Sequence, residues 1–142
     1  MSALGRLVDH DPRSRDYQAA RAPVQRSVLW GHHAPVLDQQ NLGSCTGNAA
    51  AQLINTDYFA KSRPSGYLGE VDAVRIYALA TRLDGIADNT YPPTDGGSSG
   101  LGAAKAGVRL KYFSGYKHCF GFDAFAAALQ LQPLIVGTSW YT

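Results

Sequence analysis

The sequence predicts an α+β fold in which helices come first and strands follow. Apolar residues recur at helical spacing between residues 45 and 81, whereas Val108, Leu110 and Tyr112 alternate with charged residues and an apolar run occupies 134–141. A period of three to four residues is typical of a helix with one buried face, and alternation is typical of a half-buried strand. The 142 residues, 45% of them hydrophobic, suffice to bury the core of one domain.

An extended N-terminal arm is expected over residues 1–30. Residues 9–17 are dense in charge, include Pro12 and show no helical period. We expect such an arm to wrap around the rest of the domain. The chain then divides into a helical half over 31–107 and the start of a β-rich half over 108–142.

Three helices are expected in the first half, and the first two are the longer ones. The first should run from Cys45 to near Lys61, with one apolar face. That face is formed by Ala49, Ala50, Leu53, Ile54 and Tyr58. After a loop over 62–70 that is rich in Gly, Pro and Ser, a second helix should begin at Val71 and stop at Asp84-Gly85.

Residues 86–100 form a long loop with several turn signals, and loops of this length are uncommon unless they are functional. We therefore expect it to form a rim of a substrate site. Ser98 or Ser99 can cap a short helix that runs through Ala106, with Gly107 as its C-terminal signal.

Three elements are expected after this helix. The alternation over 108–112 predicts a half-buried strand, and Asp123 is a plausible N-cap for a helix that carries Phe125 and Leu129. The apolar run 134–141 predicts a strand buried in a sheet. Such a strand needs partners, because an exposed apolar edge promotes association.

One motif points to chemistry. Gln39 stands six residues ahead of Cys45, which opens the first predicted helix within the sequence Leu42-Gly-Ser-Cys-Thr-Gly-Asn-Ala49. Together with Pro35-Val36 and Asp38-Gln39, which keep the same register, this motif resembles the papain-like cysteine peptidases, most closely their compact bacterial and bacteriophage members. A lone cysteine at a helix start is more often a small, buried and inert residue, and that alternative stays open.

The resemblance implies a role for each residue of the motif. Cys45 would be the nucleophile, and the side chain of Gln39 with the backbone N–H of Cys45 would form an oxyanion hole. A helix N-terminus favours the thiolate that attacks a carbonyl. Gly43 and Ser44 would let a substrate approach the sulfur.

A second, looser similarity lies downstream. Asp95-Gly-Gly-Ser-Ser99 resembles the segment of that family whose glycine backbone pairs with extended substrate, which implies a substrate-binding role for Gly96 and Gly97. Thr46 stands where the secreted enzymes of that family have a tryptophan. The resemblance therefore does not define the part of the site that would hold the leaving group. Leu42 replaces a cysteine of the secreted enzymes, which fits a reducing compartment.

The family's catalytic histidine and asparagine are expected roughly 130 to 150 residues beyond the cysteine. On this interpretation the chain holds the cysteine-bearing half and only the start of the β-rich half. The general base would then come from a missing C-terminal half or from a second chain. We expect no catalytic role for His10, His32, His33 or His118, and no metal site at the adjacent pair His32-His33.

Three functional hypotheses follow. The first is a thiol peptidase that acts on a peptide or protein, and the second is a bacteriophage hydrolase that acts on peptidoglycan peptides. The third is a papain-like binding or structural protein without catalytic activity, or one part of a two-chain assembly. No cofactor is expected for any of them.

Charge and hydropathy exclude other classes. A net charge of +2 with scattered basic residues argues against nucleic acid as a partner. No segment approaches the roughly 20 apolar residues of a membrane span, and the N-terminus lacks a signal-peptide pattern. We therefore expect a cytoplasmic protein with free thiols at Cys45 and Cys119, associated with virions or lysis if it is of phage origin.

Overall fold

The computed structural model describes residues 7–9, 11–23, 26–60 and 66–138, and this part of the chain is mostly helical. A 3-10 helix, η1, is followed by five α-helices. Their bounds are η1 Pro12–Tyr17, α1 Cys45–Ile54, α2 Asp57–Ala60, α3 Glu70–Leu83, α4 Gly100–Arg109 and α5 Phe122–Leu129. Strand pairing in the described residues is limited to three isolated bridges, at Leu7–Ser99, Gln18–His118 and His32–Thr56.

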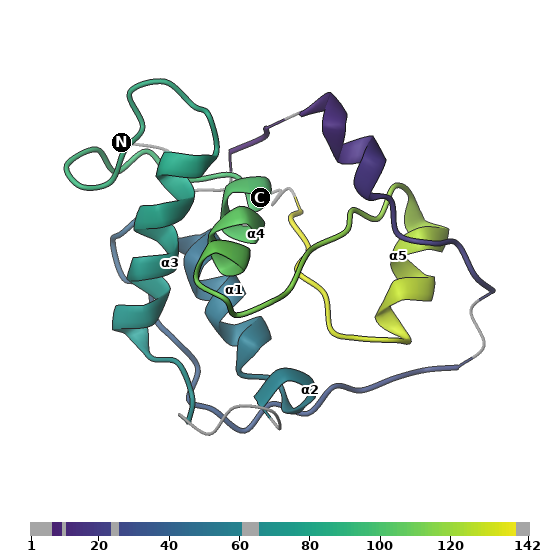
Figure 1. Ribbon diagram of the computed structural model, residues 1–142. Coiled ribbons are helices and arrows are strands. Elements are labelled where there is room, and N and C mark those ends of the chain that lie inside the picture. The colour runs from purple at the N-terminus through teal and green to yellow at the C-terminus, as the bar shows by residue number, and fades with distance from the viewer. Residues whose placement is uncertain (1–6, 10, 24–25, 61–65, 139–142) are drawn as a thin grey trace.

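The core is a three-helix cluster in which α3 packs against both α1 and α4 (Figure 1). Its buried side chains are small, and alanines predominate. The members are Ala50, Ala51, Ile54, Leu68, Ala73, Ile76, Ala80, Ala103 and Ala106. Glycine permits the close approach, because a Cβ at Gly47 would lie 2.3 Å from the Ala73 carbonyl oxygen and one at Gly102 would lie 2.7 Å from that of Ala80.

The first predicted helix begins at Cys45 as expected but ends at Ile54 instead of near Lys61. Asn55 terminates it, because its buried side chain accepts from the Leu68 N–H at 2.8 Å and donates to the Leu68 carbonyl at 2.9 Å. Thr56 then pairs with His32 before the short α2 starts. Lys61 and most of the following loop lie outside the described residues.

The second predicted helix is confirmed as α3. The Asp72 carboxylate accepts a hydrogen bond from the Gly69 N–H at 3.0 Å, which caps its first turn. Gly85 follows the helix with a φ of +72°, a left-handed conformation that glycine adopts without strain.

The expected strand at 108–112 is wrong, because α4 continues through Arg109 and residues 110–112 form a turn. Ser99 is the N-cap, and its hydroxyl accepts from the Gly102 N–H at 2.9 Å. Gly107 does not end this helix. It lies inside the helix, and the Phe113 ring packs so close to it that a Cβ there would lie 1.9 Å from the ring.

The terminal segment also differs from expectation. Residues 133–138 form no strand, and 139–141, the remainder of the expected strand, lie outside the described residues. No described segment offers them a neighbouring strand. The expected start of a β-rich half therefore contains, over its described residues, one helix and irregular chain.

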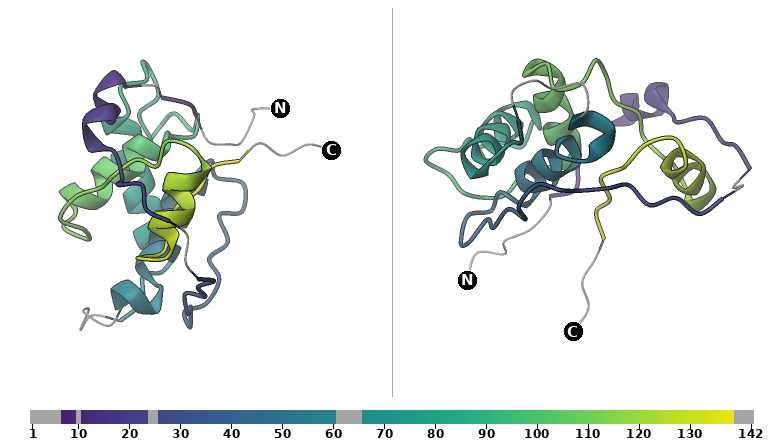
Figure 2. Two further views of the ribbon diagram at one scale, coloured as in Figure 1. Left: turned by 90° about the vertical axis from the view of Figure 1, so that its right-hand side faces the viewer. Right: turned by 90° about the horizontal axis from the view of Figure 1, so that it is seen from below.

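That helix, α5, begins after Gly121, so Asp123 lies in its first turn and is not its N-cap. Among the described helices, α5 does not pack against any of α1 to α4, and it stands apart from them in two views (Figures 1 and 2). The N-terminal arm holds it instead. The indole of Trp30 donates to the Leu129 carbonyl at 2.8 Å, and the Arg26 N–H donates to the Gln130 side chain at 3.1 Å.

The arm is not extended throughout, since Pro12–Tyr17 forms η1. Asp11 caps this turn by accepting from the Arg13 N–H, and the Arg13 guanidinium lowers the pKa of Asp11 to about 2. Beyond it, the ring of Tyr17 stacks on that of Tyr116 with centroids 5.4 Å apart. The expectation that the arm wraps the domain is thus supported by its contacts with residues 116–130.

None of the helices in the described ranges has the length and apolar character needed to cross a bilayer.

Replacement of Gly47 by alanine should destabilise the protein. In an ordinary helix interior this change gains about 1 kcal/mol. Here the new Cβ would clash with the Ala73 carbonyl and the backbone of Tyr77, so we expect a net loss of roughly 1 to 3 kcal/mol in the free energy of unfolding. Urea titration measures it, and Gly100→Ala is the matched control because nothing lies within 4 Å of its Cβ. Equal effects of the two substitutions would contradict the close approach.

Asp84 gives stability a pH dependence. Its carboxyl is buried after α3; Oδ1 accepts from the Ile86 N–H at 3.1 Å, and Oδ2 has no hydrogen-bond partner among the described residues. Burial raises its pKa above the usual 3.8 and outweighs the backbone N–H groups of Ile86 and Ser99, which lower it. Because the folded state then holds this proton more tightly than the unfolded state, the contribution to stability is present below pH 3.8 and declines as the pH rises.

Asp84→Asn should remove this dependence. We expect the unfolding free energy of the wild type, minus that of Asp84→Asn, to fall as the pH rises from about 3 to 7. Urea titrations of both proteins across that range test it, with the exposed Asp88→Asn as a control for the loss of one surface charge. A difference that stays constant or grows would show that burial of Asp84 does not penalise its charge.

Candidate functional site

Cys45 is the first residue of α1, and its side chain is half-buried. Ser44, directly before it, is fully buried and donates its hydroxyl hydrogen to the Asn48 side chain at 2.8 Å. The Asn48 amide in turn donates to Glu70 at 3.2 Å, at the start of α3. The start of α1 is thus fixed from inside the protein, and Ser44 belongs to that framework.

Gln39 lies in a tight loop before Cys45. Its side-chain amide donates to the Leu42 carbonyl at 2.7 Å, and the Leu42 N–H donates back to the Gln39 carbonyl at 3.1 Å. An amide NH₂ group carries two hydrogens, so this bond uses one of the two. The loop is tied to α3 through the Asp38 N–H, which donates to the same Glu70 carboxylate that holds Asn48.

The predicted rim segment lies against the start of α1. The Asp95 carboxylate accepts the Gly43 N–H with both oxygens, at 3.0 and 3.1 Å. A Cβ at Gly43 would lie 3.2 Å from the Gly97 nitrogen. The buried hydroxyls of Thr46 and Ser98 also pair. Four of the expected site residues, Gly43, Cys45, Gly96 and Gly97, therefore come from two segments that meet.

The two glycines of the rim differ. Gly97 is buried, its N–H donates to the Tyr77 hydroxyl at 3.1 Å, and its carbonyl accepts from the Asn89 amide at 2.8 Å. Gly96 is half-exposed, and a Cβ there would collide with the Asn89 side chain. Gly97 is thus already engaged with the protein itself, which leaves Gly96 as the rim glycine that is open to solvent.

Asp95, Tyr77 and Asn89 were not identified from the sequence. Asp95 and Asn89 lie in a loop whose polar residues all resemble turn formers. Tyr77 offered the best signal, because it falls in the apolar stripe of α3 and a buried tyrosine hydroxyl usually has a hydrogen-bond partner. Its position predicted such a partner but could not identify it as Asp95, which accepts the hydroxyl at 2.6 Å.

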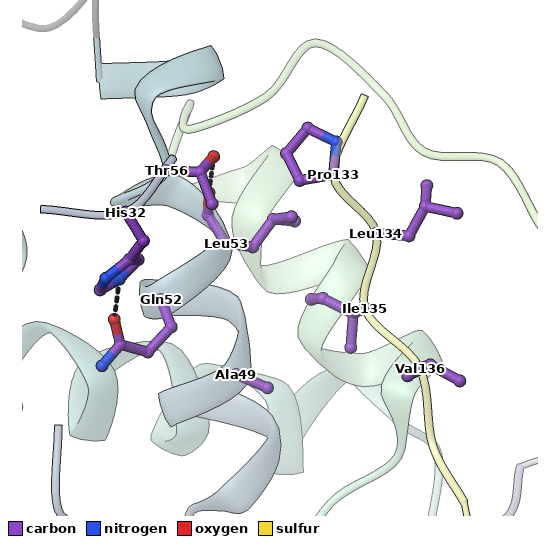
Figure 3. A pocket seen from close by; sticks show the side chains of 9 residues that line it. All are labelled: His32, Ala49, Gln52, Leu53, Thr56, Pro133, Leu134, Ile135 and Val136. Carbon is purple, nitrogen blue, oxygen red and sulfur yellow. Dashed lines mark hydrogen bonds between the residues drawn. The ribbon is translucent and has the colours of Figure 1, made fainter. Parts of the chain in front are cut away.

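An apolar groove runs beside the exposed face of α1 (Figure 3). Its other wall is the segment 133–136, and Ala49, one turn beyond Cys45, lies near one end. The remaining lining residues are His32, Gln52, Leu53 and Thr56.

Of the described histidines, His32 lines this groove, and His33 and His118 lie in other settings. His32 pairs with the Gln52 side chain, and His33 lies 3.1 Å from the Asp57 carboxylate, both toward the C-terminal end of α1. His118 exchanges backbone hydrogen bonds with Tyr17 and Ala19 of the arm. His10 lies outside the described residues. Within the described ranges, His, Cys, Asp and Glu form no group of three or more that could hold a metal ion.

The second cysteine, Cys119, is a free, half-buried thiol whose pKa is raised by burial. It lies between His118 and Phe120 in the segment that the arm covers.

No protein-family model, no curated protein and no solved structure matches this chain.

Proposed function

We propose that the chain is the cysteine-bearing half of a papain-like thiol peptidase, with Cys45 as nucleophile and Gln39 as oxyanion donor. One observation carries the proposal. Cys45 opens α1, and both segments that the motif assigns to its assistance are hydrogen-bonded to residues beside it: the Gln39 loop through Glu70 and Asn48, and the rim through Asp95 and Gly43.

In the proposed reaction the Cys45 thiolate attacks the carbonyl carbon of a peptide bond. The helix N-terminus favours the negative sulfur before attack. The backbone N–H of Cys45 and the remaining amide hydrogen of Gln39 would then stabilise the oxyanion. The reaction also needs one titratable group within hydrogen-bond reach of the sulfur. This group takes the thiol proton, returns it to the departing amine as a general acid, and then activates the hydrolytic water as a general base.

That base would come from a further part of the protein or from a second chain. The described histidines support this, because His32 pairs with Gln52 and His33 with Asp57 toward the far end of α1, and His118 is hydrogen-bonded to the arm. The substrate class is a peptide, either in a protein or in a peptidoglycan cross-bridge. For a protein substrate we place the reaction in the cytoplasm, where thiols stay reduced, whereas a peptidoglycan substrate would place it with virions or lysis.

The same histidine placement favours a second candidate, a binding or structural protein that keeps the fold without turnover. In that case the groove beside α1 and the rim would hold a peptide that is never cleaved. The peptidase needs a reactive Cys45 sulfur, whereas the binding protein does not.

Cys45 should therefore be alkylated faster than Cys119 at pH 6. A thiolate at a helix start reacts at a pH where a half-buried thiol with a raised pKa does not. We expect the rate constant of Cys45 to exceed that of Cys119 about tenfold. Iodoacetamide labelling with mass spectrometry of the two cysteine-containing peptides measures it, and unfolded protein, in which the rates should converge, is the control. Equal rates in the folded protein would favour the binding protein.

Gln39→Ala should lower turnover in the active assembly. Loss of one oxyanion donor costs about 10²- to 10³-fold in kcat. The assay is hydrolysis of a casein-derived peptide and of a peptidoglycan cross-bridge peptide. Gln40→Asn is the matched control, because Gln40 is exposed and has a left-handed φ of 51° that asparagine tolerates. Cys45→Ser should abolish cleavage, and unchanged kcat in Gln39→Ala would remove Gln39 from the oxyanion hole.

A further inference from the structure

The Asp95 carboxylate joins three separate segments. It accepts the Gly43 N–H with both oxygens, and the hydroxyl of Tyr77, which lies on α3, donates to its Oδ1 at 2.6 Å. The Tyr77 oxygen in turn accepts the Gly97 N–H at 3.1 Å. A single relay thus links the chain before α1, the middle of α3 and the rim.

The relay is well suited to hold these segments rigidly. Hydrogen bonds to a carboxylate are roughly twice as strong as those between neutral groups. Burial, with the hydrogen bond to Asp95, raises the pKa of Tyr77, so its hydroxyl stays protonated and remains a donor over the working pH range. Gly43 fits only because it lacks a side chain, since a Cβ there would lie 2.7 Å from Asp95 Oδ1.

We propose that Asp95 is the positioning residue of the Cys45 site, holding the start of α1 in register with the Gly96-Gly97 rim through Gly43 and Tyr77. The inference rests on the proposed function, because register between nucleophile and rim matters only if a peptide bridges them. Asp95 acts through its neighbours and not on the substrate. A misplacement of about 1 Å can cost 10²-fold in rate, so a bond remote from the chemistry can control it.

Two substitutions separate the branches of the relay. Asp95→Asn leaves one acceptor for Gly43 and replaces the other by a donor, so it weakens the contacts to Gly43 and Tyr77 together. Tyr77→Phe keeps the carboxylate and its bonds to Gly43 but removes the acceptor of the Gly97 N–H. Asp88→Asn, an exposed carboxylate of the same loop with a left-handed φ of 57°, is the matched control.

Amide hydrogen exchange of the full chain, followed by NMR, tests the relay itself. We expect Asp95→Asn to accelerate exchange at both Gly43 and Gly97, and Tyr77→Phe to accelerate it at Gly97 alone. Asp88→Asn should change neither. If Asp95→Asn alters neither amide, the relay does not hold the segments and the inference fails. If Asp95→Asn does not fold, the exchange of Tyr77→Phe tests the relay instead: faster exchange at Gly97 alone supports the relay, and unchanged exchange at Gly97 contradicts it.

Two alkylating reagents test what the relay positions. In a Cys119→Ser background, a peptidyl chloromethyl ketone needs both rim and sulfur, whereas iodoacetamide needs the sulfur alone. We expect Asp95→Asn and Tyr77→Phe each to lower the second-order rate constant for the peptidyl reagent about tenfold, because the concentration that gives half-maximal labelling rises. The rate constant for iodoacetamide should stay within about twofold of the wild-type value. The double variant should be no worse than Asp95→Asn alone, because both act through one relay.

If Asp95 only stabilised the fold, Asp95→Asn would lower the melting temperature and leave the ratio of the two labelling rate constants unchanged. That result would overturn the inference. Failure of the proposed function gives a different result. In that case the wild type itself would react with the peptidyl reagent no faster than with iodoacetamide, and its labelling would not saturate.

Discussion

The distance between α3 and its two neighbours determines most of this structure. Gly47 of α1 and Gly102 of α4 lie against the backbone carbonyls of Ala73 and Ala80, at separations that leave no room for a methyl group. Six of the nine residues in the core cluster are alanines, with Ile54, Leu68 and Ile76 among them, so close backbone approach contributes much of the packing between the helices. Such a core has little capacity to adjust, because a single added carbon must displace a helix.

The candidate site inherits this rigidity, because α3 supplies the anchor of each of its segments. Glu70, at the start of α3, holds the Gln39 loop and Asn48, and Tyr77, two turns later, reaches Asp95 and Gly97. Two polar side chains on one helix therefore locate the cysteine, the glutamine loop and the rim relative to one another. The long loop over 86–99 returns to α3 through the bonds of Asp95 and Gly97 to Tyr77, and the Asn89 amide closes the loop on itself by donating to the Gly97 carbonyl. These bonds explain how the loop is ordered without regular structure.

Local sequence signals predicted the helices well and the later half poorly. Capping residues and apolar periodicity located α3 and the starts of α1 and α4, because these depend on neighbours in the chain. Asn55 ends α1 through a contact with Leu68, and the Phe113 ring packs against Gly107 within α4, and neither partner is visible in a local window. The motif gave Gly43 and Gly97 each a role in substrate binding, whereas their contact and the relay through Asp95 and Tyr77 required the fold.

Because of the way α5 is attached, α5 and the three-helix cluster should differ in their free energy of local unfolding. The three-helix cluster shares buried contacts among all its members, whereas α5 is fixed by the indole of Trp30, by Gln130 and by the stacked rings of Tyr17 and Tyr116. No contact joins α5 to any of α1 to α4 in the described part of the chain, which is typical of a subglobal unit with its own, smaller free energy of opening. The arm segment from Tyr17 to Arg26 and α5 would separate from the cluster together, as one cooperative unit, while Leu7 keeps its bond to Ser98 and the cysteine and its helix stay folded.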